Sequence, residues 1–545
     1  MTHRVRLALL AVPALFLGCL FAWPIVAILT TSLHAAGGGW DIGHAADTLV
    51  APATRHVLWF TLVEAGLSTV VTVVVAMPAA WVLGRIDVPG RGLYRVAVTI
   101  PFVLPTVVVA AAFLALAGPQ GVLAPHVRID GSLTAIVAAH AFFNYAVVAR
   151  VVGGQWARLD PRPEEAARAL GAGPVRVFAT ITVPRLRGAI TSAAVLTFLF
   201  CSTSYGVIVL LGGQTQATLE TAIARAALTG GDRPAAAALA VLQLVAVAAL
   251  LVVETRLRDR RETAVGVVPE SVAVHRPRHG RERAAVAAAM ASTAVFLGGP
   301  LAVLAERSLR VGGGHGFGWY RTLGQPGGRA SVVFGSPWAA IRTSLGYATG
   351  AAVVAAVVGG AAAVAVAARR DRLGRAADTA LALPLGASAV TVGFGFLVAL
   401  DRPPLDLRDS TLLVPLAHAL IGIPFVVRAV APALRSIDPR LRAAAQVLGA
   451  SPARVWRDVD LALVGRPFLV ATGFAFAISL GEFGATSVLA RADHPTVTVA
   501  IGRLLGHPGA ASFGQAAAMS MVLLALTAAA VLVFDRGRIG AVGSF

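Results

Sequence analysis

The apolar residues of this chain gather into twelve runs of about 20 residues each, separated by shorter polar segments. A helix of that length crosses the roughly 30 Å hydrocarbon layer of a membrane. A soluble protein of 545 residues would instead alternate apolar and polar residues with the period of a helix or a strand. Charged residues make up only 13% of the chain, about half of their share in soluble domains. The sequence therefore predicts an all-α, polytopic membrane protein.

The twelve runs fall into two sets of six. We expect the first set of spans near residues 9–32, 57–83, 94–117, 133–153, 189–211 and 235–253. We expect the second set near residues 284–305, 340–368, 376–400, 411–433, 466–490 and 514–534. Between the sets, residues 254–283 are rich in Arg, Glu and Pro, which is typical of a solvated linker. The predicted organisation is a six-helix unit over 1–253, a cytoplasmic linker over 254–283 and a second six-helix unit over 284–545.

The basic residues predict the orientation of the chain. All 46 are arginines, and most of them fall on one side of the membrane if the N-terminus is cytoplasmic. Because cytoplasmic loops carry an excess of basic residues, we expect both termini to lie in the cytoplasm. We expect the membrane to be a bacterial inner membrane. The first apolar run exceeds the core of a signal peptide, so we expect an uncleaved first span. The net charge of +19 lies in short loops rather than on a folded basic face, so we expect membrane lipid and no nucleic acid as a partner.

Two absences limit the chemistry of the chain. There is no lysine, and a P-loop needs the Lys of its GxxxxGK[ST] motif to reach the nucleotide phosphates. The chain therefore cannot hydrolyse ATP through such a loop. Cys19 and Cys201 lie inside apolar runs far apart in the sequence, so we expect neither a disulfide nor a metal role for them. We expect no cofactor in this chain and no catalytic residues.

The chain also repeats itself. A shift of 278 positions aligns His140–Gly206 with His418–Gly484 without a gap, and 11 of the 18 positions from Asp160 to Val177 are identical in the second copy. The identical residues of the first copy are Asp160-Pro161-Arg162, Ala166-Ala167, Leu170-Gly171-Ala172, Pro174 and Arg176-Val177. Six spans, an even number, separate the copies, so the two halves have the same orientation in the membrane. Parallel repeats of this kind are related by an axis along the membrane normal.

The repeated polar segment lies between the fourth and fifth spans of each half. Asp160 and Asp438 are suitable N-caps, and the proline after each suits the first turn of a helix. Gly171 and Gly449 interrupt the helix, and a proline three residues later restarts it. The pattern predicts two short helices with a tight bend on the cytoplasmic side. A plain connecting loop is the alternative, but a loop without a function would have diverged between the copies, so we favour docking of a partner.

These residues resemble a known motif. Glu165-Ala166-Ala167, followed by three residues, Gly171, nine residues, Ile181, two residues and Pro184, is similar to the EAA loop of binding-protein-dependent ABC importer permeases. The resemblance covers essentially the whole chain. It implies the type I permease fold, a separate ATP-binding-cassette ATPase that carries ATP and Mg, with two copies expected, and an external solute-binding protein.

The resemblance also implies which residues contact the ATPase. The coupling residues are Glu165, Ala166, Ala167 and Gly171 in the first half and Ala443, Ala444, Ala445 and Gly449 in the second half. The second copy departs from the motif, because Ala443 replaces the Glu and Ala462 stands where the Pro is expected. This departure leaves open whether both loops contribute equally.

Shorter stretches resemble the fused permeases that import thiamine or ferric iron. Residues 479–486, SLGEFGAT, look like a stretch shared by this subgroup and by molybdate permeases. In the first half, Leu211-Gly212-Gly213, Gln216-Ala217-Thr218, Glu220, Ala222-Ile223 and the run from His140 to Asn144 look more like the thiamine branch. The resemblance therefore favours thiamine, or a related pyrimidine, as substrate, with ferric iron as the alternative.

Polar side chains within the spans are candidates for the substrate path, because buried ionisable groups in a membrane are costly. Ser204 and Glu482 occupy equivalent positions of the repeat, and a carboxylate would suit a cationic substrate such as thiamine. The candidate path residues are Ser202, Ser204, Tyr205, Ser479 and Glu482. The alternative is that these groups, and Glu64, form hydrogen bonds between helices. His140 and His418 lie at span starts, and we expect no carboxylate or Cys near them, so we expect both to be structural or interfacial.

Two other classes of protein fit part of this pattern. A major-facilitator-type secondary transporter also has twelve spans, parallel halves and a central cytoplasmic linker, but it has no need for a duplicated two-helix projection after the fourth span. A membrane sensor or scaffold would need a signalling domain, and residues 254–283 are too few to form one. The sequence therefore favours the permease subunit of an ABC importer.

Overall fold

The computed structural model describes residues 3–34, 39–213, 215–259, 269, 273–277, 279–324, 336–369, 371–401, 405–491 and 493–534. Most of these residues are helical, and the one sheet among them is a two-stranded hairpin. Residues 260–268, 270–272 and 278 of the expected linker 254–283 lie outside the described residues. The first residues of that segment continue a helix to Asp259, and another helix begins at Gly280.

The first half contains long helices joined by short ones. Its elements are α1 (His3–Leu17), the π-helical turn η1 (Gly18–Ala22), α2 (Trp23–Ser32), α3 (Ile42–Val50), α4 (Pro52–Arg85), α5 (Arg91–Val103), α6 (Thr106–Ala117), α7 (Leu133–Trp156), α8 (Arg162–Ala169), α9 (Pro174–Val177), the π-helical turn η2 (Phe178–Thr182), α10 (Val183–Ser202), α11 (Gly206–Leu211), α12 (Leu219–Leu228) and α13 (Arg233–Asp259).

The second half repeats this order, with a hairpin added after its first span. Its elements are α15 (Gly280–Thr293), the π-helical turn η3 (Ala294–Gly298), α16 (Gly299–Leu309), β1 (Arg310–Val311), β2 (Gly314–His315), α17 (Gly318–Thr322), α18 (Pro337–Ala367), α19 (Arg372–Gly386), α20 (Ala389–Ala399), α21 (Leu413–Arg435), α22 (Pro439–Val447), α23 (Pro452–Val455), the π-helical turn η4 (Trp456–Leu461), α24 (Ala462–Gly481), α25 (Gly484–Leu489), α26 (Val497–Leu505) and α27 (Ala510–Phe534).

The described residues include ten helices long and apolar enough to cross a membrane, and each lies where the sequence predicts a span. The other two expected spans, 94–117 and 376–400, are wrong as continuous helices. The first consists of α5 and α6, which meet at an angle of 100°. Its break follows from Pro105, because a proline holds the residue before it, Leu104, in an extended conformation. The second is divided into α19 and α20, where Ser388 caps the new helix by accepting a hydrogen bond from Thr391 N.

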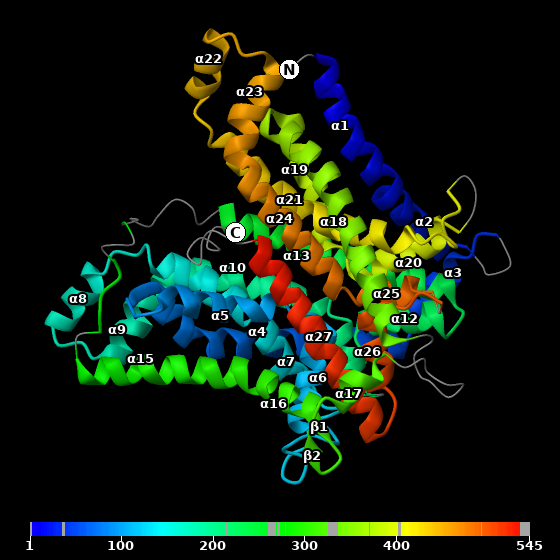
Figure 1. Ribbon diagram of the computed structural model, residues 1–545, viewed down its shortest axis with the longest axis horizontal. Helices are drawn as coiled ribbons and strands as arrows, with labels where there is room; N and C mark the ends of the chain where they lie inside the picture. The colour runs from blue at the N-terminus through cyan, green and yellow to red at the C-terminus, as the bar shows by residue number, and fades with distance from the viewer. Residues whose placement is uncertain are drawn as a thin grey trace.

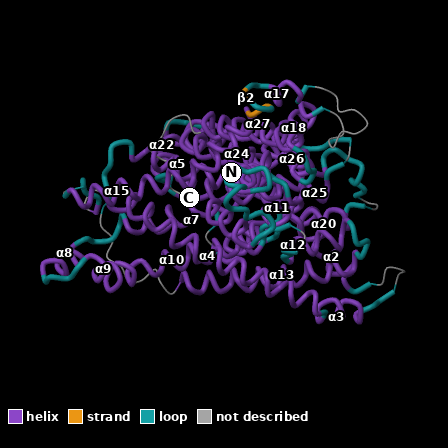
Figure 2. Tube along the Cα trace, turned by 90° about the horizontal axis from the view of Figure 1, so that it is seen from below, coloured by secondary structure: helices purple, strands orange, loops and turns teal. Residues whose placement is uncertain are grey.

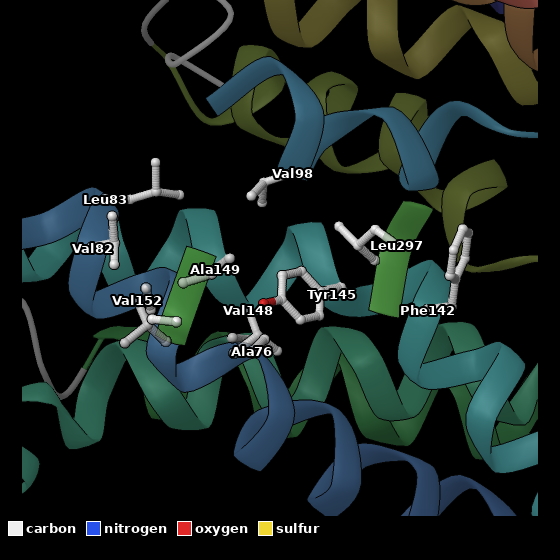
Figure 3. Packing of buried hydrophobic residues seen from close by; sticks show 14 of the residues in the cluster. Ala76, Val82, Leu83, Val98, Phe142, Tyr145, Val148, Ala149, Val152 and Leu297 are labelled. Atoms are coloured by element: carbon white, nitrogen blue, oxygen red, sulfur yellow. The ribbon is translucent and has the colours of Figure 1, made fainter. Parts of the chain in front are cut away.

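The first span of each half packs against the other half. Helix α1 runs along the helices of the second half (Figure 1). The side chains of Phe16 and Leu17, at its end, contact the buried cluster formed by α18, α21 and α24. In the reverse direction Leu297 joins the core of the first half beside Phe142 and Tyr145 (Figure 3). The hydroxyl of Thr293 lies 2.8 Å from that of Tyr145. The two halves are therefore interlocked rather than merely side by side.

The core of the first half lies between α4 and α7. Ala76, Val82 and Leu83 face Val148, Ala149 and Val152, all buried (Figure 3). The two helices approach closely because Gly84 faces Gly153, and a Cβ at Gly84 would lie 2.9 Å from the carbonyl oxygen of Gly153. Small residues at such crossings are typical of helix packing in membranes.

Two arms carry the helical projections predicted from the repeat. One arm holds α4, α7, α10 and α15 and ends at α8 and α9, and the other holds α18, α21 and α24 and ends at α22 and α23 (Figure 1). Seen from below, α8 and α9 lie at one end of the molecule and α3 at the other (Figure 2).

Candidate functional site

The repeated segments form matching pairs of short helices, as the sequence predicts. In the first copy Asp160 Oδ1 accepts a hydrogen bond of 3.0 Å from Arg162 N, and in the second copy Asp438 Oδ1 accepts one of 2.9 Å from Arg440 N. These carboxylates satisfy a free backbone donor at the start of α8 and of α22. The same local chemistry therefore starts both helices.

The bend after each helix depends on a glycine. Gly171 has φ of +85° and Gly449 has φ of +80°, a left-handed conformation that residues with a Cβ adopt at a cost. In each copy the next backbone amide, of Ala172 or Ala450, donates to the carbonyl five residues earlier. These bonds close the C-terminal turn of the helix. The two loops therefore have the same shape despite their different sequences.

The expected coupling residues lie on the outer surface of these loops. Glu165, Ala166, Gly171, Ala443, Ala444 and Gly449 are exposed, and Ala167 and Ala445 are half-buried. Two leucines that the sequence reasoning missed lie between them: Leu170 is 89% exposed and the equivalent Leu448 is 86% exposed. Exposed large apolar side chains at the same place in both copies are typical of a surface that contacts another protein.

A second feature lies where the halves meet. Two of the expected spans, 189–211 and 466–490, are interrupted rather than continuous: α10 ends at Ser202 and α11 begins at Gly206, while α24 ends at Gly481 and α25 begins at Gly484. The interruptions are equivalent under the shift of 278. The ring of Tyr205, in the first break, contacts the ring of Phe483, in the second, with 5.6 Å between centroids. The two breaks therefore meet between the halves.

Comparison with known proteins agrees with this architecture. No family model matches the chain. It is 26% identical to the thiamine transport system permease protein ThiP of Brucella abortus over 521 residues, 94% of this chain and 92% of that protein. It is 25% identical to ThiP of Escherichia coli over 451 residues, 81% of this chain and 82% of that protein. Over 171 residues, 30% of this chain and 76% of the relative, it is 31% identical to the molybdenum transport system permease protein ModB of Azotobacter vinelandii.

The chain belongs to the ABC importer permeases. The matches to ThiP run along almost the entire permease and therefore cover both of its halves. The alternative of a major-facilitator-type transporter is thereby excluded. These relatives are transport permeases by name, which agrees with the expectation that the chain is a transport subunit rather than an enzyme.

Glu482 of the permease has partners that the sequence did not reveal. Its carboxylate accepts hydrogen bonds from the backbone amides of Ala485 and Thr486, both at 2.9 Å, and from the Thr486 hydroxyl at 2.8 Å. It also lies 3.1 Å from Nε2 of His418. The side chain therefore caps the start of α25, where a carboxylate also favours the positive end of the helix.

The other candidate path residues divide between two environments. Ser202, Ser204 and Tyr205 are half-buried at the first break, and the Ser202 hydroxyl donates to Leu199 O at 3.0 Å. Ser479 is buried, and its hydroxyl lies 2.8 Å from Nδ1 of His418. The structure thus brings Tyr205 close to the second break, and it places Ser479 and Glu482 together beside His418.

The sequence-based statement that the two histidines have no carboxylate or Cys nearby is wrong. His140 lies 2.5 Å from the Glu64 carboxylate and His418 lies 3.1 Å from that of Glu482, with all four side chains buried. The partners were missed because Glu64 belongs to a different span, 76 residues away in sequence. Both histidines hold helices together, which agrees with the structural role expected for them.

A third buried group of polar side chains joins the two halves. Glu220 accepts hydrogen bonds from Gln243, at 2.7 Å, and from Ser388 of the second half, at 2.6 Å. The amide oxygen of Gln243 accepts a hydrogen bond of 3.0 Å from Thr391. No cluster of His, Cys, Asp and Glu suited to a metal ion occurs among the residues that the structure describes. Glu220 therefore acts in the contact between the halves.

Proposed function

We propose that this permease imports thiamine across a bacterial inner membrane, using a partner ATPase for energy and an external binding protein for delivery. The observation that carries the proposal is the similarity to thiamine permeases along 94% of the chain. The short motifs in residues 211–223 support the same substrate. Ferric iron is the alternative, because residues 479–486 resemble both branches.

Energy enters through the coupling loops in this proposal. Glu165 and the alanines of α8, together with their counterparts on α22, contact two ATPase subunits that bind ATP and Mg. The exposure of Leu170 and Leu448 supports such docking, since each adds apolar surface at the tip of a loop. The distribution of arginines supports cytoplasmic termini on the same side as these loops.

The solute passes between the two helix breaks in this proposal. Discontinuous helices at the contact of two repeats are where transporters expose backbone groups to their substrates. Ser202, Ser204 and Tyr205 face the passage from the first half. Ser479 and Glu482 stabilise the second break and do not face the passage, because their polar atoms bond His418 and the start of α25.

One reconstitution tests the proposal. The permease is assembled in vesicles with its ATPase, and the binding protein is titrated with thiamine and, separately, with ferric iron. We expect thiamine to bind, to be taken up with ATP, and to stimulate hydrolysis that the permease alone does not show. If the binding protein holds only ferric iron, thiamine is the wrong substrate. ATP hydrolysis by the permease alone would contradict the proposal that a partner ATPase supplies the energy.

The role of Glu482 can be tested separately. Glu482→Gln keeps the size of the side chain but weakens the cap of α25 and the contact with His418. We expect it to lower the free energy of unfolding by about 2 kcal/mol, since hydrogen bonds to charged groups are worth about that much. The KM for thiamine should stay near that of the wild type. A raised KM with unchanged thermal stability would instead place Glu482 in the substrate path.

A further inference from the structure

Arg85 is an almost fully buried arginine at the cytoplasmic end of α4, with 3% of its surface exposed. Its Nη2 donates to the Glu164 carboxylate at 3.0 Å, and its Nη1 donates to Leu159 O at 2.8 Å. Glu164 lies in the first turn of α8, the first coupling helix. One side chain therefore joins a membrane span, the segment after α7 and the coupling helix.

Further contacts extend this group. The Thr182 hydroxyl, at the end of η2, donates to Glu164 at 3.1 Å. The backbone of Arg85 accepts a hydrogen bond of 2.9 Å from His275 N, in the segment between the halves. The Arg85–Glu164 pair is thus the point where α4, α8, the start of the fifth span and the connection to the second half meet.

The second coupling helix is held by an ion pair in which the helix carries the arginine and the start of the fifth span carries the carboxylate. Under the shift of 278, Glu164 corresponds to Arg442 and Thr182 corresponds to Asp460. Arg442 Nε donates to Asp460 at 2.6 Å, and its Nη2 donates to Leu434 O, at the end of α21, at 3.3 Å. In the first half the coupling helix carries the carboxylate, and in the second half it carries the arginine.

A similar contact is therefore made by different residue types in the two halves. In the first half the link to the segment after the fourth span and to the start of the fifth runs through Arg85, Glu164 and Thr182. In the second half the same two regions are linked by Arg442 and Asp460 alone, because Ala363 stands at the position of Arg85. The first pair has side chains only 4% and 7% exposed, and the second has 34% and 10%. Removing one member of a buried pair leaves an uncompensated charge, so each pair fixes its helix in one position.

We propose that Arg85–Glu164 and Arg442–Asp460 are equivalent anchors that transmit movement of the ATPase from the coupling helices to the membrane spans. The four side chains are positioning residues for coupled transport, because they hold the docking helix without belonging to its exposed face. This inference rests on the proposed function, in which the loops dock an ATPase.

The anchor of the second half can be transplanted into the first. The double variant Glu164→Arg/Thr182→Asp recreates the second pair but leaves Arg85 facing another arginine. The triple variant, with Arg85→Ala added, removes that repulsion. We expect uptake per ATP hydrolysed to fall about tenfold in the double variant and to return close to the wild-type ratio in the triple variant. The two proteins differ only at position 85.

Single variants complete the test. Arg85→Gln and Glu164→Gln should each lower uptake per ATP about tenfold while the ATPase still co-purifies. Arg276→Gln is the matched control, because Arg276 pairs with Asp87 in an exposed contact where 88% of its side chain is accessible. It should keep the wild-type ratio.

The outcomes separate this inference from the proposed function. Wild-type coupling in Arg85→Gln and Glu164→Gln would overturn the anchors, and so would a triple variant as uncoupled as the double variant. If the wild-type permease binds no ATPase, the proposed function, in which the coupling loops dock an ATPase, is contradicted instead.

Discussion

Gly171→Val is expected to abolish uptake while the permease stays folded in the membrane. The glycine turns the chain at φ of +85°, and a β-branched residue is strongly disfavoured there. A left-handed conformation costs a residue with a Cβ about 1–2 kcal/mol, which the loop relieves by changing its bend. Leu170 and the rest of the α8 tip then leave their docking position. The measurement is ATP-driven uptake in vesicles, together with co-purification of the ATPase.

A neighbouring glycine supplies the control. Gly173 is exposed and has φ of −66°, and neither glycine has an atom within 4 Å of an added Cβ. Steric space is therefore equal at the two positions, and only the backbone conformation differs. Gly173→Val should transport nearly as well as the wild type. Equal loss in both variants would show that added bulk, rather than the bend, disturbs docking, and normal uptake by Gly171→Val would exclude the bend as a requirement.

Much of this fold follows from local rules that a sequence reveals directly. The ten long membrane helices are apolar runs, and the coupling loops carry their own caps and bends, Asp160 and Gly171 in one copy and Asp438 and Gly449 in the other. Each of these features depends on residues close together in the chain. Because the repeat carries the same caps and bends twice, a chance pattern in an Ala-rich sequence does not explain them.

The broken helices were harder to predict because apolar residues continue through them. The residues around Thr203 are apolar or weakly polar, and Glu482 is the one charged residue beside Phe483, so the hydropathy pattern continues across both breaks. Pro105 and Pro384 gave local signs of an interruption in two other spans, but a proline within a membrane span often leaves the helix intact. The breaks depend on contacts between spans that composition alone does not contain.

The buried ion pairs escaped the sequence for a related reason. Arg85 and Glu164 are 79 residues apart, and Arg85 falls at the end of an apolar run where arginines usually face lipid headgroups or water. The pair Arg442–Asp460 takes the positions of Glu164 and Thr182, and Ala363 takes the position of Arg85, so neither ion pair is repeated in the other half. A search for identical residues therefore passes over both pairs, whereas a comparison of contacts finds them.

The double variant Tyr205→Ala/Phe483→Ala is expected to open a passive leak for thiamine. These two rings form a contact between the helix breaks of the two halves, at 5.6 Å between centroids. The Phe483 ring also fills the space beside two glycines, Gly206 and Gly502, where a Cβ would approach it to 3.0 and 3.1 Å. Large-to-small changes at such a site leave a cavity because the surrounding backbone relaxes only partly. Vesicles preloaded with radiolabelled thiamine should lose it without ATP, about tenfold faster than wild-type vesicles.

The matched control also removes two contacting aromatic rings, but from inside one half. Phe425 and Phe474 are half-buried on α21 and α24, with 5.3 Å between ring centroids, and both belong to the second half. Phe425→Ala/Phe474→Ala should lose stability comparably but keep the vesicles tight, because its cavity does not lie between the breaks. A leak in both variants would indicate general loosening of the helices. Tight vesicles with normal ATP-driven uptake in the Tyr205 and Phe483 variant would place the passage elsewhere, since the two rings could then not be closing it.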